Sequence, residues 1–304
     1  MPKSKLDRRG FLTSSAGLVG AAALVGCKSE AARPAPTPVP HVPAAPRSPT
    51  TIRIASVPTA VEGNLLPTLI EEFQKVSAYR VELQTNPDLY SAARAGKVDL
   101  AVSHYGHRDA EAFVVDGLGE FPRMVFSNQM ALVGPPSDPA KIRGLDDAAE
   151  AFRRIASTKS PFVVNEIDGI RYLVEILWNA AGKPDRSGWL REHGKEDALR
   201  EADKLAAYTF WGLTPFLRTR KTEHVALEPL VLADPLLQRM LVTIVVKPDK
   251  IDGVNRDGAL AFQSFLLAPS TQARIREVRY SDETPTITWV PAGRNNRTAV
   301  LPHG

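Results

Sequence analysis

Residues 51–73 read TIRIASVPTAVEGNLLPTLIEEF, and this stretch indicates how the folded part of the chain is built. The apolar residues at 52–55 predict a short buried strand. Apolar side chains then recur at helical spacing over residues 65–76 and predict an amphipathic helix. Residues 56–64, which separate the two, are expected to form a polar turn. A strand followed by a helix that covers it is the repeating unit of a parallel α/β sheet.

The same alternation of strand and helix continues along the chain. Further strands are predicted at 81–83, 100–103, 130–133, 162–164, 225–232 and 241–246, and helices at 89–95, 146–157, 170–177, 197–207 and 259–267. The long apolar strands near 130 and near 243 fit two crossings of the chain between lobes. We therefore expect an α/β fold with two lobes, each a mainly parallel sheet flanked by helices, in which 51–128 plus 248–291 form one lobe and 129–247 form the other.

The N-terminal region has the features of an export signal. Residues 1–26 combine a basic start, the twin arginines Arg8 and Arg9, and a mild apolar stretch that is too short to span a membrane. Cys27 is the only cysteine and follows the small-residue pattern of lipoprotein processing. The Pro- and Ala-rich residues 27–50 are expected to form an extended tether, and 292–304 a polar tail.

The charge distribution argues against a nucleic-acid-binding protein. The predicted signal carries Lys3, Lys5, Arg8 and Arg9 against Asp7, a net charge of +3 out of +4 for the whole chain. The processed chain is therefore close to neutral, and it lacks the clustered basic excess that binding a polyanion requires.

Three predicted loops follow strand ends, where open parallel sheets bind their ligands. These loops are residues 56–64, 165–171 and 208–214, and they are rich in hydroxyl groups, with Asp168, Gly169 and Arg171 added in the second. Hydroxyls and amides suit a small, fully ionised anion because they supply dipoles without a change in protonation. For any single residue, a helix cap or a turn is the better interpretation.

The sequence contains no motif of the common hydrolases, phosphate-binding loops or zinc proteases. His104 and His107 have the spacing of a metal pair, but no third ligand is apparent, and a hydrogen-bonded loop histidine is the favoured reading. We therefore expect no catalytic activity, no metal and no cofactor.

Several stretches together resemble one family. They are RIASVPTAVEGNLLPTLIEEF, ARAGKVDLAVSH, MALVGPPSDPAKIRG, AAEAFRRIASTKSPFVV, LAAYTF and VTIVVKPDKIDGVNRDGALAFQSFLLAPSTQARI, and they span about residues 51–275. They are similar to the tungstate-type solute-binding proteins of ABC importers. The resemblance implies the two-lobed type II periplasmic-binding fold, with lobes that close over a tetrahedral oxyanion.

The scaffold matches this family better than the site does. Where the family has a run of Thr and Ser in its first loop, only Ser56 and Thr59 carry hydroxyls here, and a Gly-Thr-Gly turn is replaced around Asn86. The family's Ser-Arg-Gly-Asp-Asn-Ser-Gly-Thr-His loop is shorter and lacks its arginine. Arg171, at the family's histidine position, is a candidate substitute, whereas the nearby carboxylates of Glu166 and Asp168 disfavour a dianion.

We predict an exported solute-binding lipoprotein of an ABC importer, anchored through Cys27, that binds a tungstate- or molybdate-like oxyanion and delivers it to a membrane permease. The alternative is a binding or sensing module on the same scaffold with a different ligand or a degenerate site. An enzyme on this scaffold is the least favoured, and a monomer is expected. The predicted ligand-binding residues are Ser56, Thr59, Asn86, His104, Asn165, Asp168, Gly169, Arg171, Tyr208 and Thr209.

Overall fold

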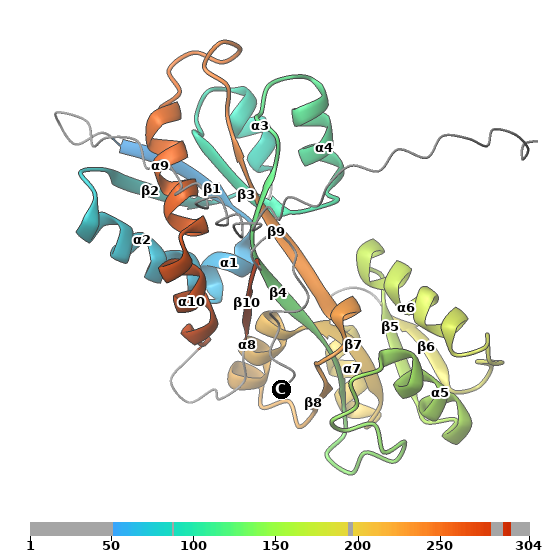
Figure 1. The fold of residues 1–304 in the computed structure, drawn as a ribbon. Helices are drawn as coiled ribbons and strands as arrows, with labels where there is room; N and C mark the ends of the chain where they lie inside the picture. The colour runs from blue at the N-terminus through green and yellow to red at the C-terminus, as the bar shows by residue number, and fades with distance from the viewer. Residues whose placement is uncertain (1–50, 87, 194–196, 281–287, 293–304) are drawn as a thin grey trace, which may run out of the picture. The chain divides into compact units, whose positions relative to one another are not determined.

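The strands and helices are those of a computed structural model, which describes residues 51–86, 88–193, 197–280 and 288–292 (Figure 1). The strands are β1 (Thr51–Ser56), β2 (Arg80–Thr85), β3 (Leu100–His104), β4 (Arg123–Gly134), β5 (Phe162–Asn165), β6 (Leu190–His193), β7 (Tyr208–Gly212), β8 (Glu228–Val231), β9 (Gln238–Val245) and β10 (Trp289–Pro291). The α-helices are α1 (Pro58–Glu62), α2 (Leu65–Val76), α3 (Leu89–Arg94), α4 (Arg108–Val115), α5 (Ala148–Thr158), α6 (Asp168–Ala180), α7 (Ala198–Lys204), α8 (Leu213–Glu223), α9 (Arg256–Leu267) and α10 (Pro269–Glu277). A 3-10 helix at Pro235–Leu237 precedes β9.

The strands are connected in the order β2-β1-β3-β9-β4-β7-β5-β6, with β8 and β10 paired to β4. Strand β1 pairs in parallel with β2 and β3, and β5 pairs in parallel with β6 and β7. Between these two parallel groups, β9 and β4 run antiparallel to their neighbours. The expected α/β fold with a sheet flanked by helices is confirmed, but the sheet is mixed, since four of the described strand pairs are parallel and five are antiparallel.

The two long apolar strands predicted near 130 and 243 are β4 and β9, which lie side by side (Figure 1). Their register places Asn128 opposite Arg239, and Trp289 of β10 lies opposite Asn128 on the other side of β4. Trp289 is fully buried, and its indole donates a hydrogen bond to the Gly63 carbonyl (3.1 Å). Arg239 therefore belongs to an interior strand, which pairs with β3 on one side and with β4 on the other.

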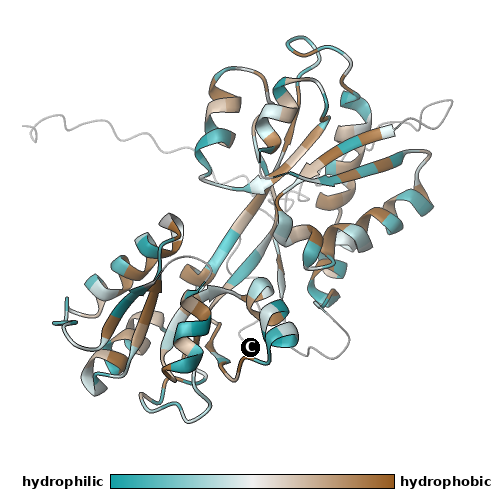
Figure 2. Ribbon diagram, turned by 180° about the vertical axis from the view of Figure 1, so that it is seen from behind, coloured by the Kyte–Doolittle hydropathy of each residue, from teal (hydrophilic) through white to brown (hydrophobic). Residues whose placement is uncertain are grey.

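Each parallel group of strands has hydrophobic clusters on its two faces. Two clusters draw on residues 52–126 and 241–289, with Phe73, Phe113 and Phe262 among their largest members. The other two draw on residues 130–237, with the rings of Phe152 and Trp178 in tilted contact at a centroid distance of 4.3 Å. In Figure 2 the helices carry both hydrophilic and hydrophobic residues, as is typical of helices that cover a sheet with one face.

Two predicted loops contain regular structure. Residues 56–64 were expected to form a turn but include α1, because Pro58 stands at the first helical position, where a missing N–H is tolerated. Residues 208–214 were expected to form a loop but comprise β7 and the start of α8. Their Tyr-Thr-Phe-Trp run has the aromatic and β-branched character of a strand, which the hydroxyl groups obscured. Helices α4, α8 and α10 and strands β6 and β10 were not predicted.

The predicted signal at 1–26, the lipidation site Cys27 and the tether at 27–50 lie outside the described residues, as does the predicted tail beyond residue 292. Among the helices that the structure describes, none has the length and apolar character needed to cross a membrane.

Candidate binding cavity

A cavity of about 430 Å³ opens where the end of β3 meets the first turns of α6 and α8. It is lined by Thr59, His104, Asn128, Met130, Ile167, Ile170, Leu199, Arg200, Trp211, Gly212, Pro215, Arg218, Thr219, Glu223 and Arg239. Both long strands contribute, since Asn128 and Met130 belong to β4 and Arg239 to β9. The cavity therefore collects residues from segments that are far apart in the sequence.

Arg239 carries a charge that no described side chain of the cavity neutralises. Its side chain is partly buried, and burial lowers its pKa from the ordinary value. Its guanidinium approaches the start of α6 so closely that a Cβ added at Gly169 would lie 3.7 Å from Nη2. Among the side chains that the structure describes, none forms an ion pair with Arg239. A cation held out of water without a counter-ion is the feature that an anionic ligand would complete.

His104, the last residue of β3, lies beside this arginine. Burial, followed by the charge of Arg239 and the proximity of His107, lowers the pKa of His104 to about 3, although a hydrogen bond to the Met240 backbone acts in the opposite direction. The imidazole is therefore neutral at physiological pH. Its Nδ1 atom is buried and has no hydrogen-bond partner within the described chain.

The other two arginines of the cavity are neutralised by carboxylates. Arg200 donates to both carboxylate oxygens of Glu223, at 2.7 and 2.9 Å. Arg218 forms an ion pair with Glu62 of α1. These pairs are exposed to solvent, so they contribute little field inside the cavity. The net charge that the described side chains present to a ligand is therefore the single positive charge of Arg239.

Helix α6 directs its N-terminus towards the same region. Its N-cap residue, Ile167, provides no side-chain cap, and both Ile167 and Ile170 line the cavity. An uncapped helix N-terminus carries unsatisfied N–H groups and a partial positive charge. Together with Arg239 it makes this part of the cavity favourable for a negative charge.

Three of the predicted ligand-binding residues lie at this cavity. Thr59 and His104 line it, and Gly169 lies against the guanidinium of Arg239. The backbone of Asp168 begins α6, but its side chain is outside the described part of the structure.

Other predicted residues use their polar groups within the fold. The Ser56 hydroxyl donates to the Val57 carbonyl (3.0 Å), and the Thr209 hydroxyl donates to the Val163 carbonyl (2.8 Å). Asn165 accepts from the Ile167 N–H (3.0 Å) and donates to the Phe210 carbonyl (3.4 Å).

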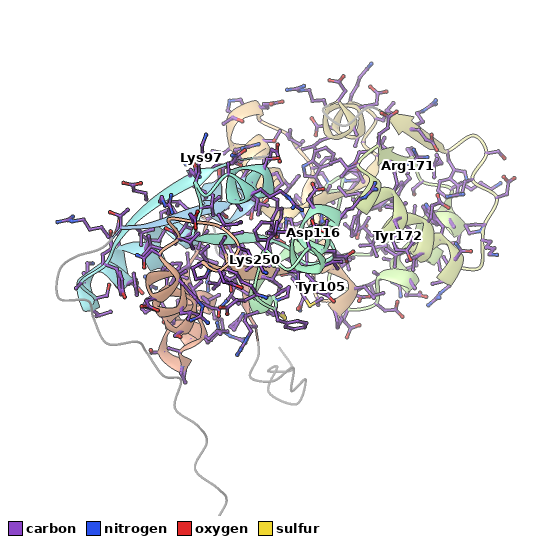
Figure 3. All side chains as sticks on the ribbon, turned by 90° about the horizontal axis from the view of Figure 1, so that it is seen from above. Lys97, Tyr105, Asp116, Arg171, Tyr172 and Lys250 are labelled. Carbon is purple, nitrogen blue, oxygen red and sulfur yellow. The ribbon has the colours of Figure 1, made fainter. Side chains whose placement is uncertain are left out.

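The remaining predicted residues lie away from the cavity. The Tyr208 hydroxyl donates to Asp138 (2.7 Å) and accepts from the Ala140 N–H (2.8 Å), and Asn86 accepts from the Asp88 N–H (2.9 Å). Arg171, the expected charge partner, is exposed on α6 (Figure 3). It is not among the residues that line the cavity.

Sequence reasoning missed Arg239 and Asn128. Arg239 could have been noticed because it stands alone among apolar residues at the start of a buried strand, in the run QRMLVTIVV. A charged residue inside such a strand is rare unless it has a partner or a function. The predicted strand began at residue 241 and left this arginine in a loop.

The possible metal pair gains no third ligand. His107 approaches Asp109 at 3.8 Å at the exposed start of α4. Within the described residues, no group of three or more His, Cys, Asp or Glu side chains is arranged to hold a metal ion.

Comparison with known proteins places the chain in a family, although no protein-family model matches it. A putative ABC transporter anion-binding protein of Haloferax volcanii is 32% identical over 229 residues, which cover 73% of this chain and 67% of that protein. The tungstate-binding protein TupA of Peptoclostridium acidaminophilum is 28% identical over 234 residues, 74% of this chain and 80% of its own length.

The fold agrees with that relationship. The solved structure of the tungstate-binding protein TupA of Desulfovibrio alaskensis covers 80% of this chain and 99% of its own, with a TM-score of 0.67 and 21% identity. These similarities match the resemblance expected from the sequence stretches. The chain belongs to the family of tungstate-type substrate-binding proteins of ABC transporters.

Proposed function

We propose that the chain is the extracytoplasmic receptor of an ABC importer, which binds a small anion in the cavity at Arg239 and delivers it to a membrane permease. The observation that carries this proposal is the partly buried guanidinium of Arg239, which has no described counter-ion and faces the uncapped start of α6. The structure therefore presents a positive charge to a ligand, in a family whose named members bind anions.

The cavity is proposed to lie between two lobes, 51–128 plus 248–291 and 129–247. Thr59 and His104 would come from the first lobe, and Ile167, Ile170 and Trp211 from the second. Strands β4 and β9 would connect the lobes, and closure would bring Thr59 and His104 towards the start of α6 and shield the ligand from water. This arrangement suits a receptor, because burial strengthens the interaction between a ligand anion and the arginine.

Export and anchoring complete the proposal. Residues 1–26 would direct export, Cys27 would carry the lipid, and 27–50 would hold the receptor at a distance from the membrane. A receptor that delivers its ligand to a permease needs to stay near the membrane surface, which is the property that one acyl-modified cysteine and an extended tether supply.

Tungstate and molybdate are the first candidate ligands, since relatives are named for tungstate. A second candidate function is a receptor or sensor for a different small anion. It is favoured by the engagement of Ser56, Asn165 and Thr209 within the fold, which removes hydroxyl and amide groups from the set available to four oxyanion oxygens.

Calorimetric titration of the full-length chain with anions tests the proposal. We expect one anion class to bind, and we expect Arg239→Gln to reduce its affinity at least tenfold. Arg220→Gln, which changes an exposed arginine on α8, is the matched control and should leave the affinity unchanged. Arg171→Gln tests the alternative source of charge, and we expect it to bind as the wild type does. A folded protein that binds no anion, or an unchanged affinity in Arg239→Gln, would contradict the proposal.

A further inference from the structure

The cavity has a composition that a tetrahedral inorganic dianion does not need. Six of its lining residues are apolar: Met130, Ile167, Ile170, Leu199, Trp211 and Pro215. Its volume of about 430 Å³ lies within the range of about 300–1,000 Å³ that holds organic ligands. An ion of five heavy atoms would leave much of this apolar wall without a partner.

The polar groups of the cavity are few. Apart from the two solvent-exposed ion pairs, the described side chains offer Thr59, His104, Asn128, Thr219 and Arg239. Three buried groups that stand near the same strand ends, Ser56, Asn165 and Thr209, are turned to backbone partners instead. The side-chain donors are therefore grouped around one guanidinium, which suits a ligand with a single charged end.

The charge balance points in the same direction. Arg239 is the one cavity cation that no described carboxylate neutralises, because Arg200 is paired with Glu223 and Arg218 with Glu62. One guanidinium matches one carboxylate in charge and can bind it through two parallel hydrogen bonds. A second negative charge in the cavity would remain without a cation.

We infer that this receptor binds a small organic monocarboxylate, whose carboxylate pairs with Arg239 and whose apolar body lies against Met130, Ile170 and Trp211. This inference rests on the proposed function of the cavity as an anion receptor, and it names the class of anion. Thr59 and the neutral imidazole of His104 supply the remaining hydrogen bonds to the carboxylate. The start of α6, at Gly169, faces the same negative end of the ligand.

Matched ligand pairs test the inference in calorimetric titrations of the full-length chain. Acetate, butyrate and valerate measure the apolar contribution, because they differ only in chain length. Butyramide is the uncharged amide of butyrate, and succinate has a second carboxylate in place of the terminal methyl of butyrate. We expect affinity to rise about three- to fourfold for each added methylene, the ratio that corresponds to ~0.8 kcal/mol per buried CH₂. We expect butyramide and succinate to bind at least tenfold more weakly than butyrate, and Arg239→Gln to abolish the preference for butyrate over butyramide.

Tungstate, molybdate, sulfate and phosphate form the second arm of the experiment. If one of these binds more tightly than every carboxylate and requires Arg239, the inference is overturned while the proposed receptor function stands. If no member of either arm binds to the folded protein, both the inference and the proposed receptor function fail.

Ile170→Ala, measured beside Arg220→Gln as a control, adds an independent readout. We expect it to weaken valerate about threefold or more, with acetate changed less, and an equal effect on both ligands would contradict the apolar contact.

Discussion

Arg239 and His104 act on each other through charge. The guanidinium is partly buried, and its field is one reason that His104 stays neutral to low pH, second only to burial of the imidazole. A bound anion would offset this field at His104 and would raise the pKa of the imidazole. The pKa of His104 should therefore differ between the free and the ligand-bound protein.

Acid should destabilise the protein through His104. Its pKa is about 3 in the folded chain and ~6.5 when unfolded, so between these values the unfolded chain binds one more proton. Stability therefore falls as the pH drops below about 6.5, by roughly 2–3 kcal/mol at pH 4.5 from this group alone. Urea unfolding of the wild type and His104→Gln between pH 7 and 4.5 measures the difference. Parallel stability curves for the two proteins would show that His104 does not hold this depressed pKa.

Tyr208 is expected to matter for stability and not for binding. Its hydroxyl bridges Asp138 and the buried Ala140 N–H, so Tyr208→Phe leaves that N–H without a partner, at a cost of about 1–3 kcal/mol. Tyr79→Phe is the matched control, because Tyr79 is buried but its hydroxyl has no described hydrogen bond. Urea unfolding and anion titration separate the two properties. A loss of anion affinity without a loss of stability would return Tyr208 to the binding site.

The residues that were predicted at the cavity, Thr59 and His104, directly follow or end strands that the apolar pattern located. Arg239 could not be assigned in this way, because its environment depends on the pairing of β9 with β4 and on the approach of Gly169 from a third segment. Likewise, the hydrogen bonds of Ser56 and Thr209 run to backbone carbonyls. Sequence spacing says which residue types lie near a strand end, but it does not say which way they turn.

At the scale of elements, the short strand β10 secures the strand that carries part of the cavity. Trp289 is fully buried, packs edge-on against Phe126 at 5.6 Å between ring centroids, and pairs opposite Asn128. We expect Trp289→Ala to reduce stability by about 3–5 kcal/mol, as for other large buried side chains. Val290→Ala, on the same strand and only partly buried, should cost about 1 kcal/mol. Thermal or urea unfolding of both variants checks this, and equal losses would show that β10 is not held by its tryptophan.

Long periodic elements were predicted well and short ones poorly. Helices α2, α5 and α6 carry continuous apolar stripes, and α5 also has a capping Asp147 that accepts from the Glu150 N–H (2.9 Å). Strand β10 has three residues and ends in proline, so its pairing comes from tertiary contacts and not from local propensity. Helix α8 was missed because its pattern is interrupted by Pro215 and dominated by polar residues.

At the scale of the whole molecule, the order of elements and the family resemblance led to the correct fold class. The antiparallel pairing of β4 with β9 is the feature on which that architecture depends; the apolar pattern predicted the two strands as crossings of the chain but did not predict that they pair. The identity of the ligand is harder to predict from sequence than the fold class, because it depends on the few polar and charged groups that the completed fold leaves without partners. Scaffold and specificity are therefore encoded on different length scales of the same chain.

The empty protein should become more stable when its binding charge is removed. Arg239→Met keeps most of the side-chain volume and avoids taking a guanidinium out of water, so we expect the free energy of unfolding to rise by about 1 kcal/mol. Thermal unfolding in anion-free buffer, beside Arg220→Met as the exposed control, measures this gain. A lower midpoint for Arg239→Met would mean that the arginine has a stabilising partner in the folded chain.

The guanidinium of Arg239, which no described carboxylate neutralises, thus places heat resistance and ligand affinity in opposition at one position. A laboratory selection for thermostable variants, carried out without ligand, would be expected to enrich neutral residues at position 239 and so to produce robust proteins that no longer capture their cargo. The same selection in the presence of the correct anion would retain the arginine. Comparing the two enriched pools would identify a suitable ligand, because only an anion that binds Arg239 would keep arginine at that position.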